Sequence, residues 1–481
     1  MTDVKNTTQK TLSQLMFWLY IVIAAGLYFL ALWLPFGHFS PAGKHAFAVF
    51  CVATFLWITN IFPIAITGIV VLFLLPITGA ISSTDVYSYF GNSAIFFVLG
   101  AFILASPVMR SGLSRRIAIK IMIRFGKGPK RLLFSIFCLS ALLAFIISEH
   151  AVAAMMLPIV LEILKYIKSQ KGSHFGFATV MAMAWGAMIG GTATLLGGAR
   201  APLTLGILSD TYGQNPILSH YSYISFLDWT IWVIPIVIAT LCFAFLSVYL
   251  IVRKSKVDIS EARLKLIEQN KQIGRITRRE VYTLLVLIAT VSMWVFYGTN
   301  WGLDWIALMG VILAFCFKIT RWEEVEKDVH WGIFIMYGSA IALSVSLKNT
   351  GAAQQMVEFI IQYGRFSPLM IMIMLMILAF ILTEIMSNAA AVAVLLPVGL
   401  ALAPQFGIDP RAIAIVIATC AGLTFMLPVS TPAMALALNS KYVNQRRVLL
   451  WGLWLKSVSF IVVLVTILLY WPLIGLSFTL N

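Results

Sequence analysis

The sequence predicts an all-α, polytopic membrane protein, and three observations support this fold class. Of 481 residues, 61% are hydrophobic and only 11% are charged, and the mean hydropathy is +0.95. A soluble domain carries about a quarter charged residues. Apolar runs long enough to cross a bilayer recur along the whole chain, and the basic residues gather in a few connectors between them. We expect about eleven spanning helices and two re-entrant hairpins.

Charge and cysteine usage exclude several classes of protein. The net charge is +16, but the basic residues are distributed as membrane orientation requires, so no nucleic-acid partner is expected. The five cysteines all lie in apolar segments without a CxxC pair, which indicates packing rather than disulfides or metal. Residues 1–14 are polar, and the apolar run 15–35 is too long for a signal peptide, so it is interpreted as the first spanning helix.

The positive-inside rule orients the segments and predicts the first hairpin. The connector 110–131 holds eight basic residues and no acid, and three lysines follow Leu164. Both stretches are therefore predicted to be cytoplasmic. Residues 132–164 must then leave the cytoplasmic side and return to it, as a re-entrant hairpin does. The basic connectors 253–279 and 439–447 are predicted to lie on the same side.

The opposite side is predicted from connectors without basic residues. Residues 80–93 and 208–224 contain no Lys or Arg and are expected to face outward. The protein is thus predicted to be a multi-pass protein of the cytoplasmic membrane, with its N-terminus in the cytoplasm and its C-terminus outside.

A duplication relates the two halves of the chain. A second hairpin is predicted at 367–402, entering from the opposite face. "SEHAVAAMMLP" from Ser148 lies over "SNAAAVAVLLP" from Ser387, and Gly112 lies over Gly351 at the same offset of 239 residues. Both hairpins follow an amphipathic stretch suited to the membrane surface. Two hairpins entering from opposite faces are typical of an inverted repeat.

Four polar clusters interrupt the apolar segments and predict a binding site. They are the hairpin tips, Ser148-Glu149-His150 and Thr383 through Asn388, and the stretches 190–202 and 425–434. In the last two, Gly, Pro, Ser and Thr break a helix halfway across the membrane. Such breaks are tolerated where they line a cavity or hold an ion. A helix N-terminus at the break can receive a carboxylate.

These motifs resemble the divalent anion/sodium symporter family, which carries di- and tricarboxylates or sulfate. Family members have a Ser-Asn-Thr motif at each hairpin tip and a proline- and asparagine-containing loop in each following broken helix. Here Ser387-Asn388 matches the motif and Ser430-Thr431-Pro432 matches the loop. The resemblance covers essentially the whole chain. It implies an elevator-type homodimeric transporter, with one Na+ among Thr383, Ser387, Asn388 and the backbone near Ser430.

The chain departs from the family pattern mainly in its first half. Glu149 and His150 stand where Asn and Thr are expected, Arg200 falls where the loop would have proline, and Ala389 replaces the second threonine. Hard cations prefer oxygen ligands, so the first Na+ site is expected to be lost, and Arg or protonated His can supply its positive charge. No cofactor is expected apart from Na+ at the second-half site. The predicted substrate-binding residues are Ser148, Glu149, His150, Gly198, Arg200, Ser387, Asn388, Ala389, Thr431 and Pro432.

The predicted function is secondary transport of carboxylates of the succinate, malate, fumarate and 2-oxoglutarate class, by Na+-independent exchange. The reason lies in Arg200: an empty site with an unneutralised guanidinium would cross the membrane poorly, whereas a bound dicarboxylate would cancel that charge. Na+-coupled symport and proton coupling remain open. Glu149 is interpreted as a partner of Arg200 or of His150, and a structural pair without a transport role is a further alternative.

Two other classes of function compete with a carrier. An intramembrane hydrolase would use Ser148 with His150, and a metalloenzyme would use Glu149 with His150. A zinc protease, however, needs two histidines around a glutamate, and only one histidine is present at this tip. A channel is disfavoured because two closed tips facing broken helices indicate a gated site. The chain is therefore not expected to be an enzyme.

The resemblance also implies a division into domains. The predicted scaffold comprises 1–110 and 280–347, and the predicted transport halves are 131–253, with the inner hairpin, and 367–481, with the outer hairpin. The helices 111–130 and 348–366 are expected to be amphipathic arms between them, and 254–279 a cytoplasmic connector.

Overall fold

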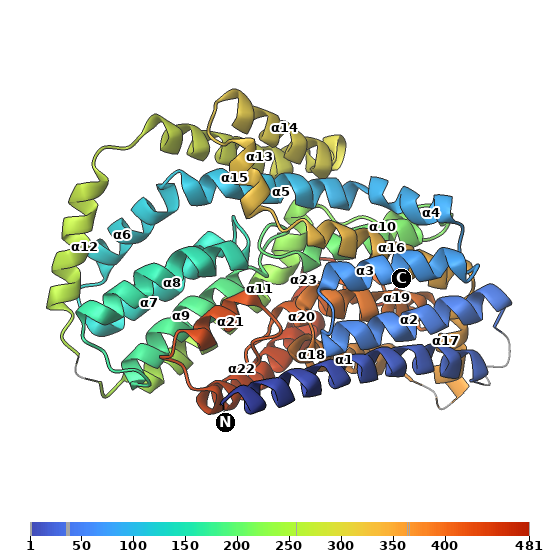
Figure 1. Cartoon of the computed structure of the whole chain (residues 1–481). Helices are drawn as coiled ribbons and strands as arrows, with labels where there is room; N and C mark the ends of the chain where they lie inside the picture. The colour runs from blue at the N-terminus through green and yellow to red at the C-terminus, as the bar shows by residue number, and fades with distance from the viewer. Residues whose placement is uncertain (1, 35–38, 256, 363, 365, 481) are drawn as a thin grey trace.

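The structure is a computed structural model that describes residues 2–34, 39–255, 257–362, 364 and 366–480. The described residues form helices and one isolated β-bridge, between Ile408 and Thr479, so the all-α prediction is confirmed. Nine of the described helices are long and apolar enough to cross a membrane. Figure 1 shows these helices stacked with their axes roughly along one direction.

Two groups of helices flank the hairpins. Both groups contain shorter apolar helices as well as full spans, and α5 of the first packs closely against α14 of the second. Their bounds are α1 Thr2–Trp33, α2 Pro41–Thr59, α3 Ile64–Ile77, α4 Ser83–Ser88 and α5 Ser93–Arg110, then α13 Arg278–Trp301, α14 Leu303–Cys316, α15 Trp322–Asp328 and α16 Gly332–Asn349.

Two helical hairpins lie where the sequence predicts them. The first consists of α7 (Pro129–Ala144) and α8 (Glu149–Tyr166), and the second of α18 (Pro368–Ile385) and α19 (Asn388–Gln405). A serine hydroxyl caps the returning helix of each: Ser148 Oγ accepts from Ala151 N and Ser387 Oγ from Ala390 N, both at 3.3 Å. In Figure 1 the first hairpin enters from the left and the second from the right, with their tips at the centre.

A broken helix follows each hairpin. The first consists of α9 (His174–Gly190) and α10 (Arg200–Tyr212), and the second of α20 (Pro410–Gly422) and α21 (Pro432–Asn439). The two non-helical breaks, 191–199 and 423–431, have the same length. The first half ends with α11 (Phe226–Val252). The second half ends with α22 (Gln445–Val465), a π-turn over Thr466–Tyr470 and α23 (Trp471–Leu473).

The duplication predicted from the sequence extends over four consecutive helices. The arm helices are α6 (Leu113–Phe125) and α17 (Ala352–Gln362), and each precedes a hairpin. The first residues of α5, α6, α7 and α8 lie 239 residues before those of α16, α17, α18 and α19. Together with the opposed hairpins, this register confirms the inverted repeat.

The number of crossing segments agrees with the prediction of about eleven. When each broken helix is counted once and the hairpins are left aside, the described part of the chain contains eleven such segments. They are α1, α2, α3, α5, α9–α10, α11, α13, α14, α16, α20–α21 and α22.

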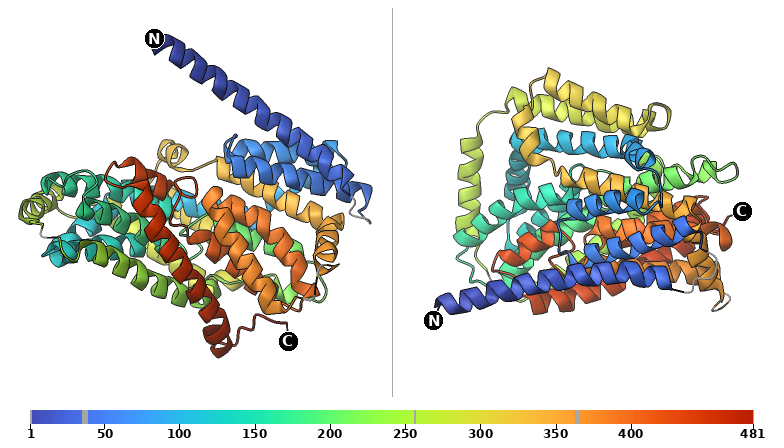
Figure 2. Two further views of the ribbon diagram at one scale, coloured as in Figure 1. Left: turned by 90° about the horizontal axis from the view of Figure 1, so that it is seen from below. Right: turned by 45° about the vertical axis from the view of Figure 1, so that its right-hand side comes forward.

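The basic connectors gather at one end of the molecule. Lys168 Nζ lies 3.6 Å from Glu261 Oε2 of α12 (Ser260–Ile273), and Arg447 Nη1 donates to Gly172 O at 3.2 Å. At the other end, Asn92 Nδ2 donates to Asp210 Oδ2 at 2.8 Å, which joins the two connectors without basic residues. The N-terminus lies toward the basic end and the C-terminus toward the other end in both figures (Figures 1 and 2). The relative sidedness of the connectors is as predicted, and the compartment that each end faces stays a prediction.

A buried ion pair fixes the first arm helix to the second flanking group. Arg116 Nε and Nη2 donate to the two carboxylate oxygens of Glu280 at 2.6 and 2.9 Å. Arg116 Nη1 also donates to Gly274 O at 2.8 Å. The two side chains are 7% and 2% exposed, so this bidentate pair and the connector before α13 are held together away from water.

We expect Arg116→Ala to destabilise the protein, because Glu280 would remain buried without its partner. Removing one partner of such a pair costs about 3–5 kcal/mol. Thermal unfolding of the purified protein in detergent should show a lower Tm for R116A than for wild type. The control is R115A, which truncates an exposed neighbour on the same helix. Equal Tm values for the two variants would contradict the prediction.

Candidate functional site

A cavity of about 560 Å³ lies between the two hairpin tips, the two helix breaks and the flanking helices. The lining residues come from three kinds of segment: the two tips, the two breaks with the first residue of the helix after each, and the flanking segments around residues 60–65 and 329–336. The lining residues are Asn60, Pro63, Ile64, Ala65, Glu149, His150, Ala199, Arg200, Val329, His330, Trp331, Gly332, Ile333, Met336, Ser387, Asn388, Ala389, Val429, Ser430 and Pro432.

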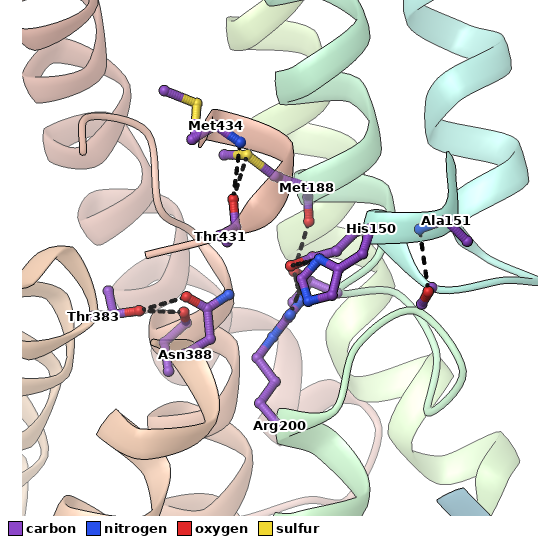
Figure 3. Close-up of polar contacts among 12 residues, drawn as sticks. His150, Ala151, Met188, Arg200, Thr383, Asn388, Thr431 and Met434 are labelled. Atoms are coloured by element: carbon purple, nitrogen blue, oxygen red, sulfur yellow. Dashed lines mark hydrogen bonds and ion pairs between the residues drawn. The ribbon is translucent and has the colours of Figure 1, made fainter. Parts of the chain in front are cut away.

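Arg200 occupies the centre of this site as the first residue of α10. Its guanidinium is buried, with the side chain 2% exposed. Nη1 donates to Glu149 Oε2 at 3.2 Å and Nη2 donates to Thr192 Oγ1 at 2.7 Å. Figure 3 shows the side chain extending between the two tips, with Asn388 on one side and His150 on the other. Of the two partners considered for Glu149, the structure shows Arg200 as the hydrogen-bonded one.

Two glycines make room for the guanidinium. A Cβ at Gly198 would lie 2.4 Å from Arg200 Nη1, and a Cβ at Gly422 would lie 2.2 Å from Arg200 Nε. Gly198 belongs to the predicted site, although it does not line the cavity. Gly422, at the end of α20 in the other half, was missed because no local pattern separates it from other helix-terminal glycines.

The first tip carries buried polar atoms that lack partners. Glu149 N donates to Gly197 O at 2.9 Å, which fixes the tip against the first break. Glu149 Oε1 and His150 Nδ1 lie 3.8 Å apart, too far for a hydrogen bond, and each is buried without a hydrogen-bond partner. Both residues line the cavity, so a ligand or a proton held there could satisfy these atoms.

The second tip presents neutral oxygen atoms. Thr383 Oγ1 donates to Ala421 O at 2.6 Å. The side-chain amide of Asn388 points one of its polar atoms at Thr383 Oγ1, Ser430 O and Ala421 O, at 3.0, 3.2 and 3.2 Å. If that atom is the nitrogen, it donates to these oxygens. If it is the oxygen, four oxygens converge, which is the donor set of a hard monovalent cation.

The structure brings together most of the predicted residues. Glu149, His150, Arg200, Ser387, Asn388, Ala389, Ser430 and Pro432 line the cavity, whereas Ser148, Gly198, Thr383 and Thr431 lie behind it. Ser148 and Ser387 cap their helices, and Thr431 caps α21 by accepting from Met434 N at 3.2 Å (Figure 3). The hydroxyl of Ser387 caps α19, and its predicted part in a Na+ site stays a prediction.

Sequence reasoning missed the wall of the cavity formed by the flanking helices. His330 and Trp331 precede α16, and Asn60 ends α2 in a left-handed conformation, with φ of 48°. It also missed a buried ion pair behind the second tip, in which Lys456 Nζ donates to Glu384 Oε1. Charged residues inside apolar segments are a recognised signal, and Glu384 and Lys456 could have been found by it.

The geometry does not assemble a hydrolytic or metal site. Ser148 Oγ is occupied by a backbone N–H, and His150 Nδ1 has no hydrogen-bond partner. Within the described ranges, no three His, Cys, Asp or Glu side chains come close enough to hold a metal ion. The polar groups instead surround a space that suits a small anion.

The chain matches the citrate transporter family, CitMHS, over residues 54–418 and again over 294–479. It belongs to this family. Membership of a transporter family confirms that the chain is a polytopic transporter rather than an enzyme, and it agrees with the resemblance to divalent anion/sodium symporters. The first matched range contains both hairpins.

Curated relatives of this citrate transporter family member are named for dicarboxylate transport. The sodium-dependent dicarboxylate transporter SdcS of Staphylococcus saprophyticus is 28% identical over 474 residues, which cover 92% of this chain and 90% of that protein. SdcS of Staphylococcus aureus strain USA300 is 28% identical over 446 residues, covering 87% and 84%.

Two solved membrane transporters share the fold. MtrF of Neisseria gonorrhoeae, described as an antimetabolite efflux pump, has a TM-score of 0.55 at 14% identity and covers 80% of this chain and 82% of that one. The YdaH transporter of Alcanivorax borkumensis has a TM-score of 0.55 at 13% identity, covering 82% and 89%.

We expect Gly422→Ala to weaken anion binding, because its Cβ would displace the Arg200 guanidinium. Losing a hydrogen bond to a charged group costs about 1.5–3 kcal/mol, or about tenfold or more in affinity. Calorimetric titration of the purified protein with citrate and with succinate measures the change. Gly91→Ala is the matched control, since a Cβ there meets nothing within 4 Å. Unchanged affinity in folded G422A would show that the position of Arg200 does not matter for binding.

Proposed function

We propose that this protein is a secondary carrier of di- and tricarboxylate anions and that the cavity between the hairpin tips is its substrate site. The observation that supports this most strongly is the convergence of four helix N-termini. Glu149, Arg200, Asn388 and Pro432 are the first residues of α8, α10, α19 and α21, and all four line the cavity. The positive ends of these helices favour an anion. The citrate transporter family and the two dicarboxylate-transporting relatives point to carboxylates.

Arg200 is proposed to bind one carboxylate group of the substrate, and the second hairpin tip is proposed to bind another. The guanidinium can form two parallel hydrogen bonds with a carboxylate, which suits planar anions. Across the cavity, Asn388 offers its side-chain amide, and α21 contributes the positive end of its helix dipole. Pro432 at the start of α21 has no N–H, and Met434 N already donates to Thr431 Oγ1. In the described structure Glu149 holds Arg200, so an incoming carboxylate must displace or share this partner.

Na+-independent exchange is proposed as the mode of transport. Glu149, His150 and Arg200 stand where the first Na+ would need oxygen ligands, so binding at that half rests on fixed charge. An unneutralised Arg200 in an empty site is the reason for exchange that the sequence suggests, and this explanation needs correction. Glu149 Oε2 lies 3.2 Å from Arg200 Nη1 and can neutralise its charge, so an uncompensated guanidinium is not what would prevent an empty carrier from returning.

Na+-coupled symport is the second candidate, and the second tip supports it. Thr383 Oγ1, Ala421 O and Ser430 O surround one polar atom of the Asn388 amide within 3.2 Å. If that atom is Oδ1, these residues would hold Na+ and lower the cost of bringing an anion beside them. The sodium-dependent names of the curated relatives favour the same candidate.

The family resemblance also implies an elevator motion and a homodimer, and both are proposed together with this function. Residues 131–253 and 367–481 are proposed to move together as an elevator against a scaffold of 1–110 and 280–347, in a homodimer in the cytoplasmic membrane. The position of the cavity supports the motion, because it lies between these two sets of residues. Sliding one set past the other would change which side of the membrane the cavity faces.

We expect Arg200→Ala and Asn388→Ala each to abolish measurable binding of succinate and citrate, because each removes a principal group on one side of the cavity. Binding is measured by calorimetric titration of the purified protein. Lys456→Ala is not a suitable control, since it leaves Glu384 buried and unpaired. Thr54→Ala is suitable, because Thr54 Oγ1 has no hydrogen-bond partner and lies outside the cavity. Wild-type affinity in R200A would assign Arg200 a structural role.

Uptake into proteoliposomes separates exchange from Na+ coupling. We expect uptake of labelled succinate to rise severalfold with unlabelled succinate inside and to stay unchanged when external Na+ is replaced by K+. Under this mode Thr383→Val should leave the rate independent of Na+. Steep Na+ stimulation without internal substrate, shifted to higher Na+ concentration in T383V, would instead establish symport.

A further inference from the structure

We propose that a basic cavity on the first arm helix binds the phosphate group of an anionic phospholipid. This cavity of about 760 Å³ lies at the basic end of the molecule, away from the substrate site. Its lining includes Arg124, Phe125, Lys127, Arg131, Phe134 and Arg263. The proposal does not depend on the transported substrate or on the coupling mode.

The charge of this cavity is of one sign. Four cations line it, namely Arg124, Lys127, Arg131 and Arg263, and no acidic residue does. None of the four forms an ion pair within the part of the chain that the structure describes. Four neighbouring like charges repel one another, so a bound anion would stabilise the arrangement.

Arg263 supplies a second, independent indication of a ligand. Its Nε is buried and has no hydrogen-bond partner. A buried N–H without an acceptor is unfavourable, and an oxygen of a phosphate group placed in the cavity would satisfy it. Arg263 comes from α12, far along the chain from the other cations, so the fold has brought this donor to the cavity.

Two aromatic rings indicate that the phosphate belongs to a lipid. Phe125 and Phe134 are 56% and 49% exposed beside the cations. Free phosphate would make no use of apolar surface, whereas the glycerol and acyl chains of a phospholipid would cover it. Basic pockets at the cytoplasmic ends of membrane helices are suited to anionic headgroups, and the positive-inside rule predicts this end to be cytoplasmic.

The bound lipid would join three segments. Arg124 and Lys127 belong to the end of α6 and the turn after it, Arg131 to the start of α7, and Arg263 to α12. The arm helix is itself anchored to α13 through Arg116 and Glu280. One phosphate group contacting all three segments would therefore connect the base of the first hairpin to the anchored arm.

Retention of lipid by the full-length protein tests this site. Wild type and variants are purified in a mild detergent containing equal phosphatidylglycerol and phosphatidylcholine, and bound lipids are counted by native mass spectrometry. K127Q/R131Q removes two charges from the cavity, and R115Q/K120Q removes one Lys and one Arg from exposed positions on the same arm. R263Q tests the buried donor separately.

We expect wild type to retain phosphatidylglycerol over phosphatidylcholine and inorganic phosphate to compete with it only at much higher concentration. Retention should fall about tenfold or more in K127Q/R131Q, since each cation near an anionic headgroup favours binding about fivefold. R263Q should also lose retention, and R115Q/K120Q should behave as wild type. Three results would overturn the proposal. They are an equal loss of phosphatidylglycerol in both double variants, equal retention of phosphatidylcholine and phosphatidylglycerol by wild type, and displacement of the lipid by inorganic phosphate at the lipid's own concentration.

Discussion

Most of this structure depends on one constraint: a backbone group freed where a helix breaks inside a membrane must find a partner within the protein. In the first half, Glu149 N donates to Gly197 O at 2.9 Å and Thr194 Oγ1 donates to Phe145 O at 2.7 Å. These bonds connect the hairpin tip directly to the break in the following helix. The tip and the break therefore form one unit, and the cavity is the space left between two such units.

The two halves meet this constraint with different chemistry. In the first, Gly191 and Gly197 approach so closely that a Cβ at Gly197 would lie 2.3 Å from Gly191 O, and the backbone of the break pairs with the backbone of the tip through Gly197 O and Glu149 N. In the second, the carboxylate of Glu384 accepts from Phe425 N at 3.1 Å and Leu427 N at 3.0 Å. That buried carboxylate needs a counter-charge, which Lys456 provides.

This difference decides where charge stands relative to the substrate. The Glu384–Lys456 pair lies behind the second tip and does not line the cavity, so that side offers neutral oxygens and an amide. The Glu149–Arg200 pair of the first half lines the cavity directly. The cavity thus has a charged half and a neutral half, although both halves of the chain have the same order of helices.

The sequence predicts the features that depend on local chemistry. The first hairpin follows from the distribution of Lys and Arg. The second hairpin and the register of 239 residues follow from the shared spacing of Ser148 and Ser387 to their prolines. The tip residues are recognisable because polar groups are conspicuous in apolar segments. Contacts between distant segments are a different matter. Gly422 and His330 reach the site only through packing, and nothing near them in the chain indicates which residue of the other half they will meet.

The partner of Arg200 has the largest consequence for function. A guanidinium cannot neutralise Glu149 and a substrate carboxylate at once. The charges of Arg200 and Glu149 cancel within their ion pair, as do those of Lys456 and Glu384. A dicarboxylate bound in the proposed site would add two negative charges to a region of low dielectric constant, where uncompensated charge is costly.

We infer that a proton taken up by Glu149, which releases Arg200 for the substrate, or Na+ beside Thr383 must compensate part of that charge. In the proposed Na+-independent exchange, the compensating ion would be the proton. It would enter and leave with each substrate, so opposite movements of two loaded carriers need no net proton flux. In symport the compensating ion must dissociate on one side before the empty carrier returns. The ion pair between Glu149 and Arg200 permits that return. The charge of Arg200 therefore does not decide between exchange and symport; the identity of the ion that compensates the substrate's charge does.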